Sequence, residues 1–351
     1  MPAARRRGKR CPHEMEIVMP IDDSAFTHHR KSINGLAYHW VSCGEGPAVI
    51  FTHGFPDMWR LWRRQMLAVA AAGFTAIAPD LRGFGESEGP ANPEHYTIVD
   101  VISDLVAILD NMGIAQAVIV GHDWGANISW AAPVLRPDRF PAVVSLAVPY
   151  TPRPPKSLPQ MFADMGRADF YMSYFCRPGE GEAELDADPE LFLRRLFYTL
   201  SGDLPDDREP NMFVGASGRF SDSLFDPPDS LDWFDDEEMA IYVDRFRRKG
   251  FATTLASYRS LTRSWELMGA WADRPLDVPA LYIYGSQEIV VRFPGRAEQI
   301  AQFTTMVPKG FEPVKIDGAG HWVQLEAPEA VNAALLDFLS ATAWSSGQVA
   351  R

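Results

Sequence analysis

The chain contains few cysteines. Only Cys11, Cys43 and Cys176 occur among 351 residues, far apart and odd in number. This pattern indicates neither a disulfide framework nor a zinc site. A reducing compartment, the cytoplasm, is therefore the expected location.

Long apolar runs and positive charge are also scarce. No run reaches the roughly 18 apolar residues that a membrane span requires. Lys and Arg number 33 against 46 Asp and Glu, which gives a formal net charge of −13. We therefore expect neither a nucleic-acid partner nor a membrane partner. The one basic cluster, residues 5–10, is followed by no apolar segment, and we interpret it as a disordered tail and not as a secretory signal.

Short apolar runs alternate with helical patterns from about residue 34. The runs predicted as strands are Ala37–Val41, Ala48–Thr52, Thr75–Ala78, Ala117–Val120 and Ala142–Val148. The segments predicted as helices are Trp59–Ala71, Thr97–Met112 and Trp124–Leu135. This alternation predicts an α/β fold with a mostly parallel central sheet flanked by helices.

The alternation stops after Val148. Residues 149–159 hold five prolines, and about a hundred residues without clear strands follow. The later helical patterns are Glu237–Lys249, Ala252–Met268, Gly295–Gln302 and Pro328–Leu339, and the later strands are Ala280–Tyr284 and Val314–Ile316. The sequence therefore predicts a poorly ordered tail (1–30), an α/β core (31–149 and 271–345) and an inserted helical cap (150–270).

The segment Gly121-His-Asp-Trp-Gly125 directly follows a predicted strand. It fits G-x-nucleophile-x-G, the turn that exposes a side chain at the top of an α/β-hydrolase sheet. Asp123 occupies the position where Ser is usual. A carboxylate with a pKa of about 3.9 is already an anion at neutral pH. Its attack on an ester would give a reactive mixed anhydride, so Asp123 favours substrates attacked at sp³ carbon, such as epoxides or alkyl halides.

Hydrolysis of the resulting alkyl ester requires a base and an oxyanion hole. His321 lies on a Gly-rich loop late in the chain, and Glu288 follows the predicted strand Ala280–Tyr284, which matches the order nucleophile, acid, His. Glu288 is the candidate to orient the imidazole of His321. The backbone N–H groups of Trp124 and Phe55 are the candidate oxyanion hole.

Other polar motifs are interpreted as structural, namely His53, His122 and Asp80–Gly85. No cluster of His, Cys or acidic residues has the spacing of metal ligands, and the sequence implies no metal and no cofactor.

Several motifs together resemble the soluble-type epoxide hydrolases of the α/β-hydrolase fold, over roughly residues 32–341. They are HGFP at His53–Pro56, PDLRGFGES at Pro79–Ser87, GHDWGA at Gly121–Ala126 and GAGHW at Gly318–Trp322. The resemblance implies that a small apolar epoxide is opened to a vicinal diol, through an ester on Asp123 that is hydrolysed by water activated by His321. It is also compatible with a homodimer.

The resemblance further implies two cap tyrosines that donate to the epoxide oxygen. It places them at Tyr171 and Tyr258, with Tyr174 as the alternative for the first. A phenol can hydrogen-bond the developing alkoxide and supply a proton. The residues expected to line the substrate pocket are Phe55, Trp124 and Trp322.

Two positions depart from the family pattern. Glu288 stands where Asp is common, which alters the contact with the catalytic His. Ser257 stands where the family often has Trp before the second tyrosine, and the smaller side chain is expected to enlarge the pocket.

Two alternative functions stay open. A haloalkane dehalogenase would use the same Asp123 and hold the halide with the Trp124 indole, although that family usually has a polar residue at the position of Phe55 and lacks the tyrosine pair. A non-catalytic hydrolase-fold binding protein normally loses the nucleophile or the His, and this chain keeps both.

Overall fold

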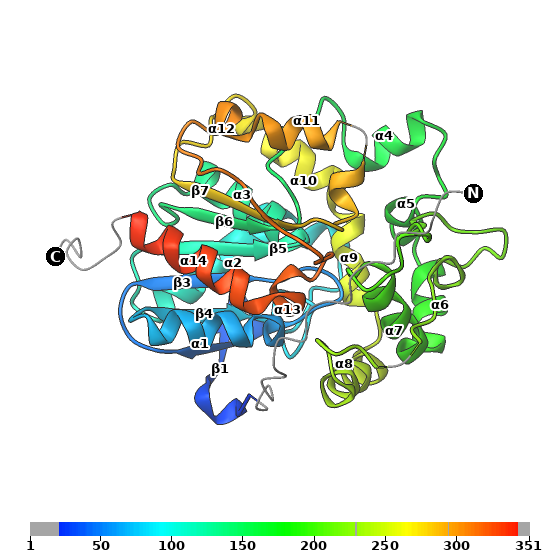
Figure 1. Ribbon diagram of the computed structural model, residues 1–351, viewed down its shortest axis with the longest axis horizontal. Coiled ribbons are helices and arrows are strands. Elements are labelled where there is room, and N and C mark those ends of the chain that lie inside the picture. The colour runs from blue at the N-terminus through cyan, green and yellow to red at the C-terminus, as the bar shows by residue number, and fades with distance from the viewer. Residues whose placement is uncertain (1–20, 229, 294, 343–351) are drawn as a thin grey trace, which may run out of the picture.

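The computed structural model describes residues 21–342 apart from 229 and 294, and it contains one sheet of eight strands (Figure 1). The strands are β1 (Thr27–Ile33), β2 (Leu36–Cys43), β3 (Ala48–Thr52), β4 (Thr75–Pro79), β5 (Ala117–His122), β6 (Val143–Leu146), β7 (Ala280–Gly285) and β8 (Val314–Ile316). Their order is β1-β2-β4-β3-β5-β6-β7-β8, and the sheet is parallel from β4 onward. The predicted α/β fold with a mostly parallel sheet is confirmed.

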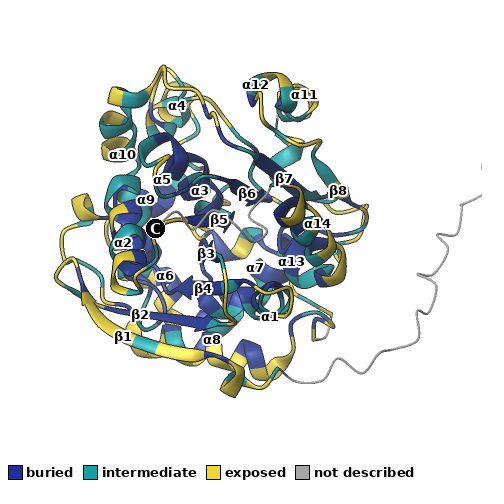
Figure 2. Cartoon of the chain, turned by 90° about the vertical axis from the view of Figure 1, so that its left-hand side faces the viewer, coloured by how far each residue is buried: buried dark blue, intermediate teal, exposed yellow. Residues whose placement is uncertain are grey.

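Helices cover both faces of this sheet (Figure 2). One layer contains α1 (Arg63–Ala71) and α14 (Pro328–Ala341), and the other contains α2 (Ile98–Asn111) and α3 (Trp124–Leu135). The central strands between them are apolar and buried because the helices cover both of their faces; every residue of β3 and β5 is buried. This rigid sheet is the platform for the side chains at its strand ends.

Seven α-helices lie between β6 and β7 among the described residues, and we call this segment the cap. They are α4 (Leu158–Asp164), α5 (Tyr171–Phe175), α6 (Glu180–Ala187), α7 (Pro189–Thr199), α8 (Asp236–Lys249), α9 (Ala252–Arg259) and α10 (Leu261–Leu267). Most of them gather beyond one end of the sheet (Figure 1). The remaining helices of three residues or more are η1 (Asp23–Ala25), η2 (Trp59–Trp62), η3 (Pro93–His95), η4 (Ser221–Ser223), η5 (Met268–Trp271), η6 (Val290–Arg292), α11 (Arg296–Ala301), α12 (Phe303–Met306) and α13 (Val323–Glu326).

The start of the chain differs from the expectation. The predicted tail reached residue 30, but η1 and β1 already occupy part of it, and β1 pairs with β2 along its whole length. The strand was missed because it is an exposed edge whose sequence, THHRKSI, buries only Ile33. The basic cluster at residues 5–10 lies outside the described residues. The division into core and cap stays a prediction.

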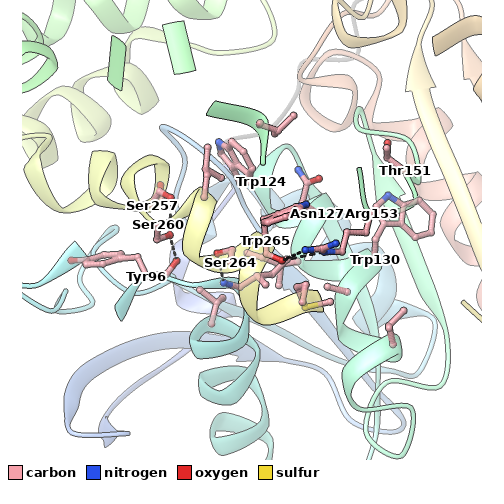
Figure 3. Close-up of a pocket in the computed structure, with 18 of the residues that line it drawn as sticks. Tyr96, Trp124, Asn127, Trp130, Thr151, Arg153, Ser257, Ser260, Ser264 and Trp265 are labelled. Atoms are coloured by element: carbon pink, nitrogen blue, oxygen red, sulfur yellow. Dashed lines mark hydrogen bonds between the residues drawn. The ribbon is translucent and has the colours of Figure 1, made fainter. Parts of the chain in front are cut away.

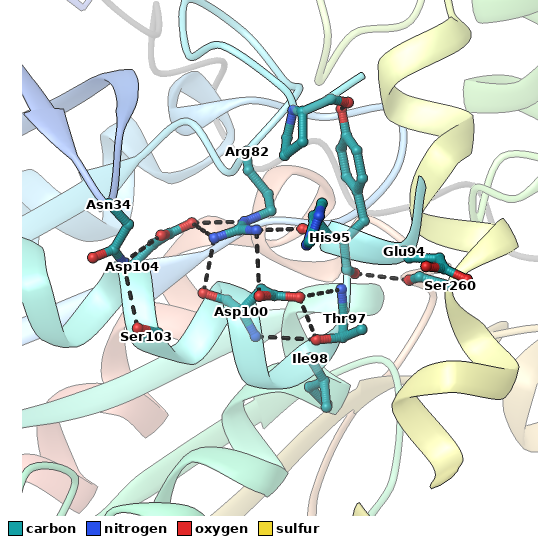
Figure 4. A network of polar contacts seen from close by, with 12 residues as sticks. Asn34, Arg82, Glu94, His95, Thr97, Ile98, Asp100, Ser103, Asp104 and Ser260 are labelled. Carbon is teal, nitrogen blue, oxygen red and sulfur yellow. Dashed lines mark hydrogen bonds and ion pairs between the residues drawn. The ribbon is translucent and has the colours of Figure 1, made fainter. Parts of the chain in front are cut away.

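The loop after β4 forms a polar network with α2 (Figure 4). The guanidinium of Arg82 donates to Asp104 over 2.7 Å, and Asn34 donates to the other oxygen of the same carboxylate over 2.8 Å. Arg82 and Asp104 are both buried, so removing one partner would cost about 3–5 kcal/mol. The structural interpretation of this loop is consistent with these contacts.

Within the part of the chain that the structure describes, no helix is long and apolar enough to cross a membrane.

Candidate active site

Asp123 stands on a sharp turn between β5 and α3. Its φ is +55°, which is unusual for a residue other than glycine. The flanking glycines allow the turn, since a Cβ on Gly121 would lie 2.1 Å from the Gly125 carbonyl oxygen and a Cβ on Gly125 would lie 2.1 Å from that of Thr52. A strained turn that aims a carboxylate out of the sheet is typical of a functional position.

The carboxylate of Asp123 is held as an anion. The Phe55 backbone N–H donates to its Oδ1 over 2.9 Å. Burial by itself would raise the pKa of Asp123, but the His321 imidazole and the Trp124 backbone N–H outweigh it, and the pKa lies below its usual value. The N-terminus of α3 also favours negative charge at this place. Asp123 is therefore ionised at neutral pH.

His321 lies between Asp123 and Glu288. Its Nε2 is 3.6 Å from Asp123 Oδ2, and its Nδ1 is 2.9 Å from Glu288 Oε2. Glu288 is fully buried after β7, and its other oxygen accepts from the Val290 N–H. Burial opposes protonation of His321, yet Glu288 and Asp123 raise its pKa well above the usual value. The longer Glu side chain thus reaches the imidazole at hydrogen-bond distance.

His122 and His53 are buried beside this group and bonded to backbone. His122 Nε2 lies 2.8 Å from the His321 carbonyl oxygen, and burial lowers the pKa of His122 to about 3. His53 Nε2 accepts from the Leu81 N–H over 3.0 Å, and burial lowers the pKa of His53 as well. Both imidazoles are neutral at physiological pH and fix the loops around Asp123.

A cavity of about 150 Å³ lies between these residues and the cap. Asp123 and His321 line it from the core, and Tyr171 on α5 and Tyr258 on α9 line it from the cap. The two tyrosine rings are 6.1 Å apart. Burial, first of all, raises the pKa of both phenols well above the usual value, so both stay protonated. The alternative, Tyr174, does not line this cavity, because its hydroxyl donates to Glu184 within the cap.

Phe55 and Trp124 also line the cavity, whereas Trp322 differs from the expectation. Trp322 is fully buried behind His321, with its ring 4.4 Å from that of Phe197. Its indole N–H donates to Asp57 over 3.0 Å. The expected place of Trp322 in the substrate pocket is therefore wrong. Its ring packs against Phe197 of the cap and its N–H donates to Asp57, so neither faces the cavity.

Two carboxyls close to the site, Asp57, which is buried, and Glu326, which is partly buried, were missed by the sequence reasoning. Asp57, next to the HGFP motif, accepts from Trp322 and from the Tyr242 hydroxyl of the cap. Glu326 accepts from the backbone N–H groups of Gly202, Gly320 and Trp322, over 2.7, 2.8 and 3.1 Å. Glu326 thus joins a cap turn to the loop that carries His321. Asp57 directly follows a recognised motif, and this was the available signal for it; Glu326 had no such signal.

Asp57 makes stability depend on pH. Burial raises the pKa of Asp57 from 3.8 to about 7, against the two hydrogen bonds that lower it. The unfolded chain releases this proton near pH 3.8 and the folded chain near pH 7, so its contribution to stability is full below 3.8 and is lost as the pH rises to about 7. Asp57→Asn removes the titrating carboxyl group and keeps a side chain of the same shape.

We expect the free energy of unfolding of Asp57→Asn to fall less than that of the wild type between about pH 4 and about pH 7, by about 4 kcal/mol, because each unit of pKa difference between the folded and the unfolded chain is worth about 1.4 kcal/mol. Thermal unfolding of both proteins across this range measures it. Parallel curves for the two proteins would show that Asp57 does not titrate in this way.

The described residues contain no group of three or more His, Cys, Asp or Glu side chains that could hold a metal ion.

Comparison with known proteins gives matches over most of the chain. A family model described as the alpha/beta hydrolase fold matches residues 47–328. Epoxide hydrolase A of Mycobacterium tuberculosis (strain ATCC 25618 / H37Rv) is 40% identical over 319 residues, which cover 90% of this chain and 97% of that protein. Epoxide hydrolase 2 of Siraitia grosvenorii is 37% identical, covering 89% of this chain and 98% of that one.

Solved structures agree with the sequence relatives. An epoxide hydrolase from an endophytic Streptomyces superposes with a TM-score of 0.86 at 34% identity, covering 91% of this chain and 96% of that one. Epoxide hydrolase A from Mycobacterium thermoresistibile gives a TM-score of 0.83 at 38% identity, covering 90% and 98%. The chain therefore belongs to the epoxide hydrolases of the α/β-hydrolase fold.

Proposed function

We propose that this epoxide hydrolase works through a covalent alkyl ester on Asp123. The observation that carries the proposal is the arrangement around one carboxylate. Asp123 Oδ1 accepts from the Phe55 N–H, while Oδ2 lies 3.6 Å from His321 Nε2. Tyr171 and Tyr258 line the same cavity from the cap. A nucleophile, a base and two proton donors thus surround one small space.

In the first step Asp123 attacks an epoxide carbon. The carbon–oxygen bond of the ring breaks as the ester bond forms, and the electron pair moves to the ring oxygen. Tyr171 and Tyr258 donate hydrogen bonds to this oxygen, and one of them supplies the proton. Their raised pKa keeps them protonated before the step and makes either phenolate a base strong enough to recover its proton afterwards.

In the second step water hydrolyses the ester. Esterification removes the charge of Asp123, which is one of the causes that raise the pKa of His321. The pKa of His321 therefore falls at this point, and the imidazole gives up its proton and is free to accept one from water. His321 takes a proton from water, and the water oxygen attacks the Asp123 carbonyl carbon. The oxyanion forms on the Asp123 carbonyl oxygen, beside the Phe55 and Trp124 N–H groups that bind this carboxylate. When the oxyanion collapses, the ester carbon–oxygen bond to the product breaks, protonated His321 gives its proton to the leaving oxygen, and the diol leaves. The new carboxyl group passes its proton to the tyrosine phenolate, which restores the Asp123 carboxylate.

A single-turnover experiment in heavy-oxygen water tests this route. With enzyme in excess over styrene oxide, the first diol should contain only ordinary oxygen, since its new oxygen comes from Asp123. The peptide that contains Asp123 should then carry heavy oxygen. Heavy oxygen in the first diol would mean that water attacks the epoxide directly, and the ester route would be wrong.

Glu288→Gln separates the two steps. We expect ester formation to stay within about twofold and ester hydrolysis to slow by about 10²-fold, because the neutral amide neither orients nor stabilises the protonated imidazole as Glu288 does. Stopped-flow tryptophan fluorescence resolves the two phases. Glu288→Asp, which keeps the charge, is the control and should recover part of the hydrolysis rate. Unchanged rates in both phases would make Glu288 a bystander.

A further inference from the structure

The loop that carries His321, residues 318–322, has two sets of partners, and we call it the histidine loop. The core holds its first part, where the Gln287 N–H donates to the Ala319 carbonyl over 2.9 Å. The N–H groups of its last three residues are bonded instead to one carboxylate and to a turn of the cap.

Glu326 on α13 supplies the carboxylate. Its Oε2 accepts from the Gly320 N–H over 2.8 Å, and its Oε1 accepts from the Trp322 N–H over 3.1 Å. The two amides lie directly before and directly after that of His321 in the chain. Glu326 therefore fixes the backbone on both sides of the residue that carries the imidazole.

The cap supplies the remaining partner through the turn that follows α7, residues 200–202, which we call the cap turn. The Leu200 carbonyl accepts from the His321 N–H over 2.9 Å, and the Gly202 N–H donates to Glu326 Oε2 over 2.7 Å. One carboxylate oxygen thus binds both the cap turn and the histidine loop.

Two glycines bring the cap turn and the histidine loop into direct contact. A Cβ on Gly202 would lie 1.9 Å from the Gly318 carbonyl oxygen, and a Cβ on Gly320 would lie 2.5 Å from the Leu200 carbonyl oxygen. The two segments cannot move closer together, and the bonds to Glu326 oppose their separation. The position of the cap turn therefore determines that of the histidine loop.

Glu326 lies outside the space where an epoxide would bind. It lines neither the cavity that contains Asp123 nor the neighbouring cavity of about 300 Å³ that Trp124 and Arg153 line (Figure 3). A residue in this place acts on the reaction only through another group. Its contacts with the histidine loop make His321 that group.

We propose that Glu326 is a positioning residue for ester hydrolysis. By binding both neighbours of His321 to the cap turn, it places the imidazole where it takes a proton from the water that attacks the ester on Asp123. The inference rests on the proposed function, because it presupposes an ester that His321 helps to hydrolyse. The cap then takes part in the second step through the backbone of the histidine loop, besides supplying two tyrosines for the first.

The charge of Glu326 decides the conditions of the test. Burial raises the pKa of Glu326 to about 7, against the Gly202 and Gly320 N–H groups that lower it, and Asp203 and Glu288 add to the rise. At about pH 8.5 the carboxylate is ionised and accepts from all three N–H groups, so the measurements are made there.

Glu326→Gln separates the two steps. A side-chain amide has only one acceptor oxygen, so its NH₂ group would meet an N–H group of the protein. In a single turnover of styrene oxide, quenched at successive times and followed by mass spectrometry, ester hydrolysis should slow at least tenfold, because a displaced base loses the geometry that the step requires. Ester formation should stay within about twofold. Glu329→Gln, at the exposed start of α14, removes the same charge and should change neither step.

Proton NMR distinguishes positioning from stability. The Nδ1 proton of His321, which is bonded to Glu288, gives a far-downfield signal that reports the place of the imidazole. Glu326→Gln should move this signal at a temperature where both proteins are fully folded. Equal slowing of both steps, or slower hydrolysis with the signal in its wild-type place, would make Glu326 a structural residue and overturn the positioning role.

Gly202→Ala tests the coupling from the cap and keeps the carboxylate. Its methyl group would push the cap turn away from Gly318, so hydrolysis should again slow and the His321 signal should move. Wild-type hydrolysis in Gly202→Ala would overturn the coupling to the cap, and wild-type hydrolysis in Glu326→Gln would overturn the whole inference while the ester route stands. Absence of any ester in the wild-type single turnover would instead overturn the proposed function and this inference with it.

Discussion

Asp123→Asn should lose turnover of styrene oxide by about 10⁴-fold or more, because the reaction then has no nucleophile and the remaining groups only bind the epoxide. The neutral amide of Asn cannot attack carbon at neutral pH, and its N–H groups would meet the Phe55 N–H that now points to Oδ1. The steady-state rate, followed by diol formation, measures the loss.

Asp123→Ala is the control for this variant, since an alanine cannot revert to an acid by deamidation. Both variants should keep the fold, because the Asp123 side chain contributes to the site and not to the apolar core. A folded Asp123→Ala protein that still turned over epoxide at more than a hundredth of the wild-type rate would contradict the proposed role of Asp123.

Replacing both tyrosines, Tyr171→Phe with Tyr258→Phe, should slow ester formation by about 10²–10⁴-fold. Without a donor the ring oxygen would leave as a bare alkoxide inside a buried cavity, where little water reaches it. The phenylalanines keep the ring contacts, including the edge-to-face contact of Tyr258 with Trp124. The rate of the first fluorescence phase in a single turnover measures the effect.

The single variants should each lose less than the pair, because either phenol alone can still donate. Tyr174→Phe is the matched control: it removes a hydroxyl from the same helix, but that hydroxyl donates to Glu184 and does not line the cavity. Ester formation at the wild-type rate in the double variant would remove Tyr171 and Tyr258 from the mechanism.

Periodicity and turn chemistry predicted much of the core. β3, β8 and α3 begin and end at the predicted residues, because each is bounded by a clear change of pattern. The predicted helix Ala252–Met268 is instead two helices, α9 and α10, which meet at Ser260. The Ser260 hydroxyl donates to the Tyr96 carbonyl of the core, a long-range contact that no local pattern reveals. The four cap helices from α4 to α7 were not predicted, since three of them have eight residues or fewer.

The candidate site was predicted where it follows strand ends and was missed where it depends on packing. Asp123, His321 and Glu288 follow β5, β8 and β7, so the topology of a parallel sheet brings them together. Trp322 adjoins His321 in sequence, yet its ring turns away to Phe197 of the cap. Glu326 joins segments that are 124 residues apart in the chain. The packing of the cap against the core determines both the orientation of the Trp322 ring and the contacts of Glu326. Local sequence carries no signal for this packing.

Intact-protein mass spectrometry of His321→Gln tests the central claim most directly. This variant keeps the nucleophile and lacks the base, so the ester should accumulate. We predict a mass gain equal to the whole of an added aryl epoxide, absent when Asp123→Asn is combined with His321→Gln. No adduct from the epoxide, or a gain of only the alkyl group from a chloroalkane in its place, would contradict the proposed ester route for epoxides.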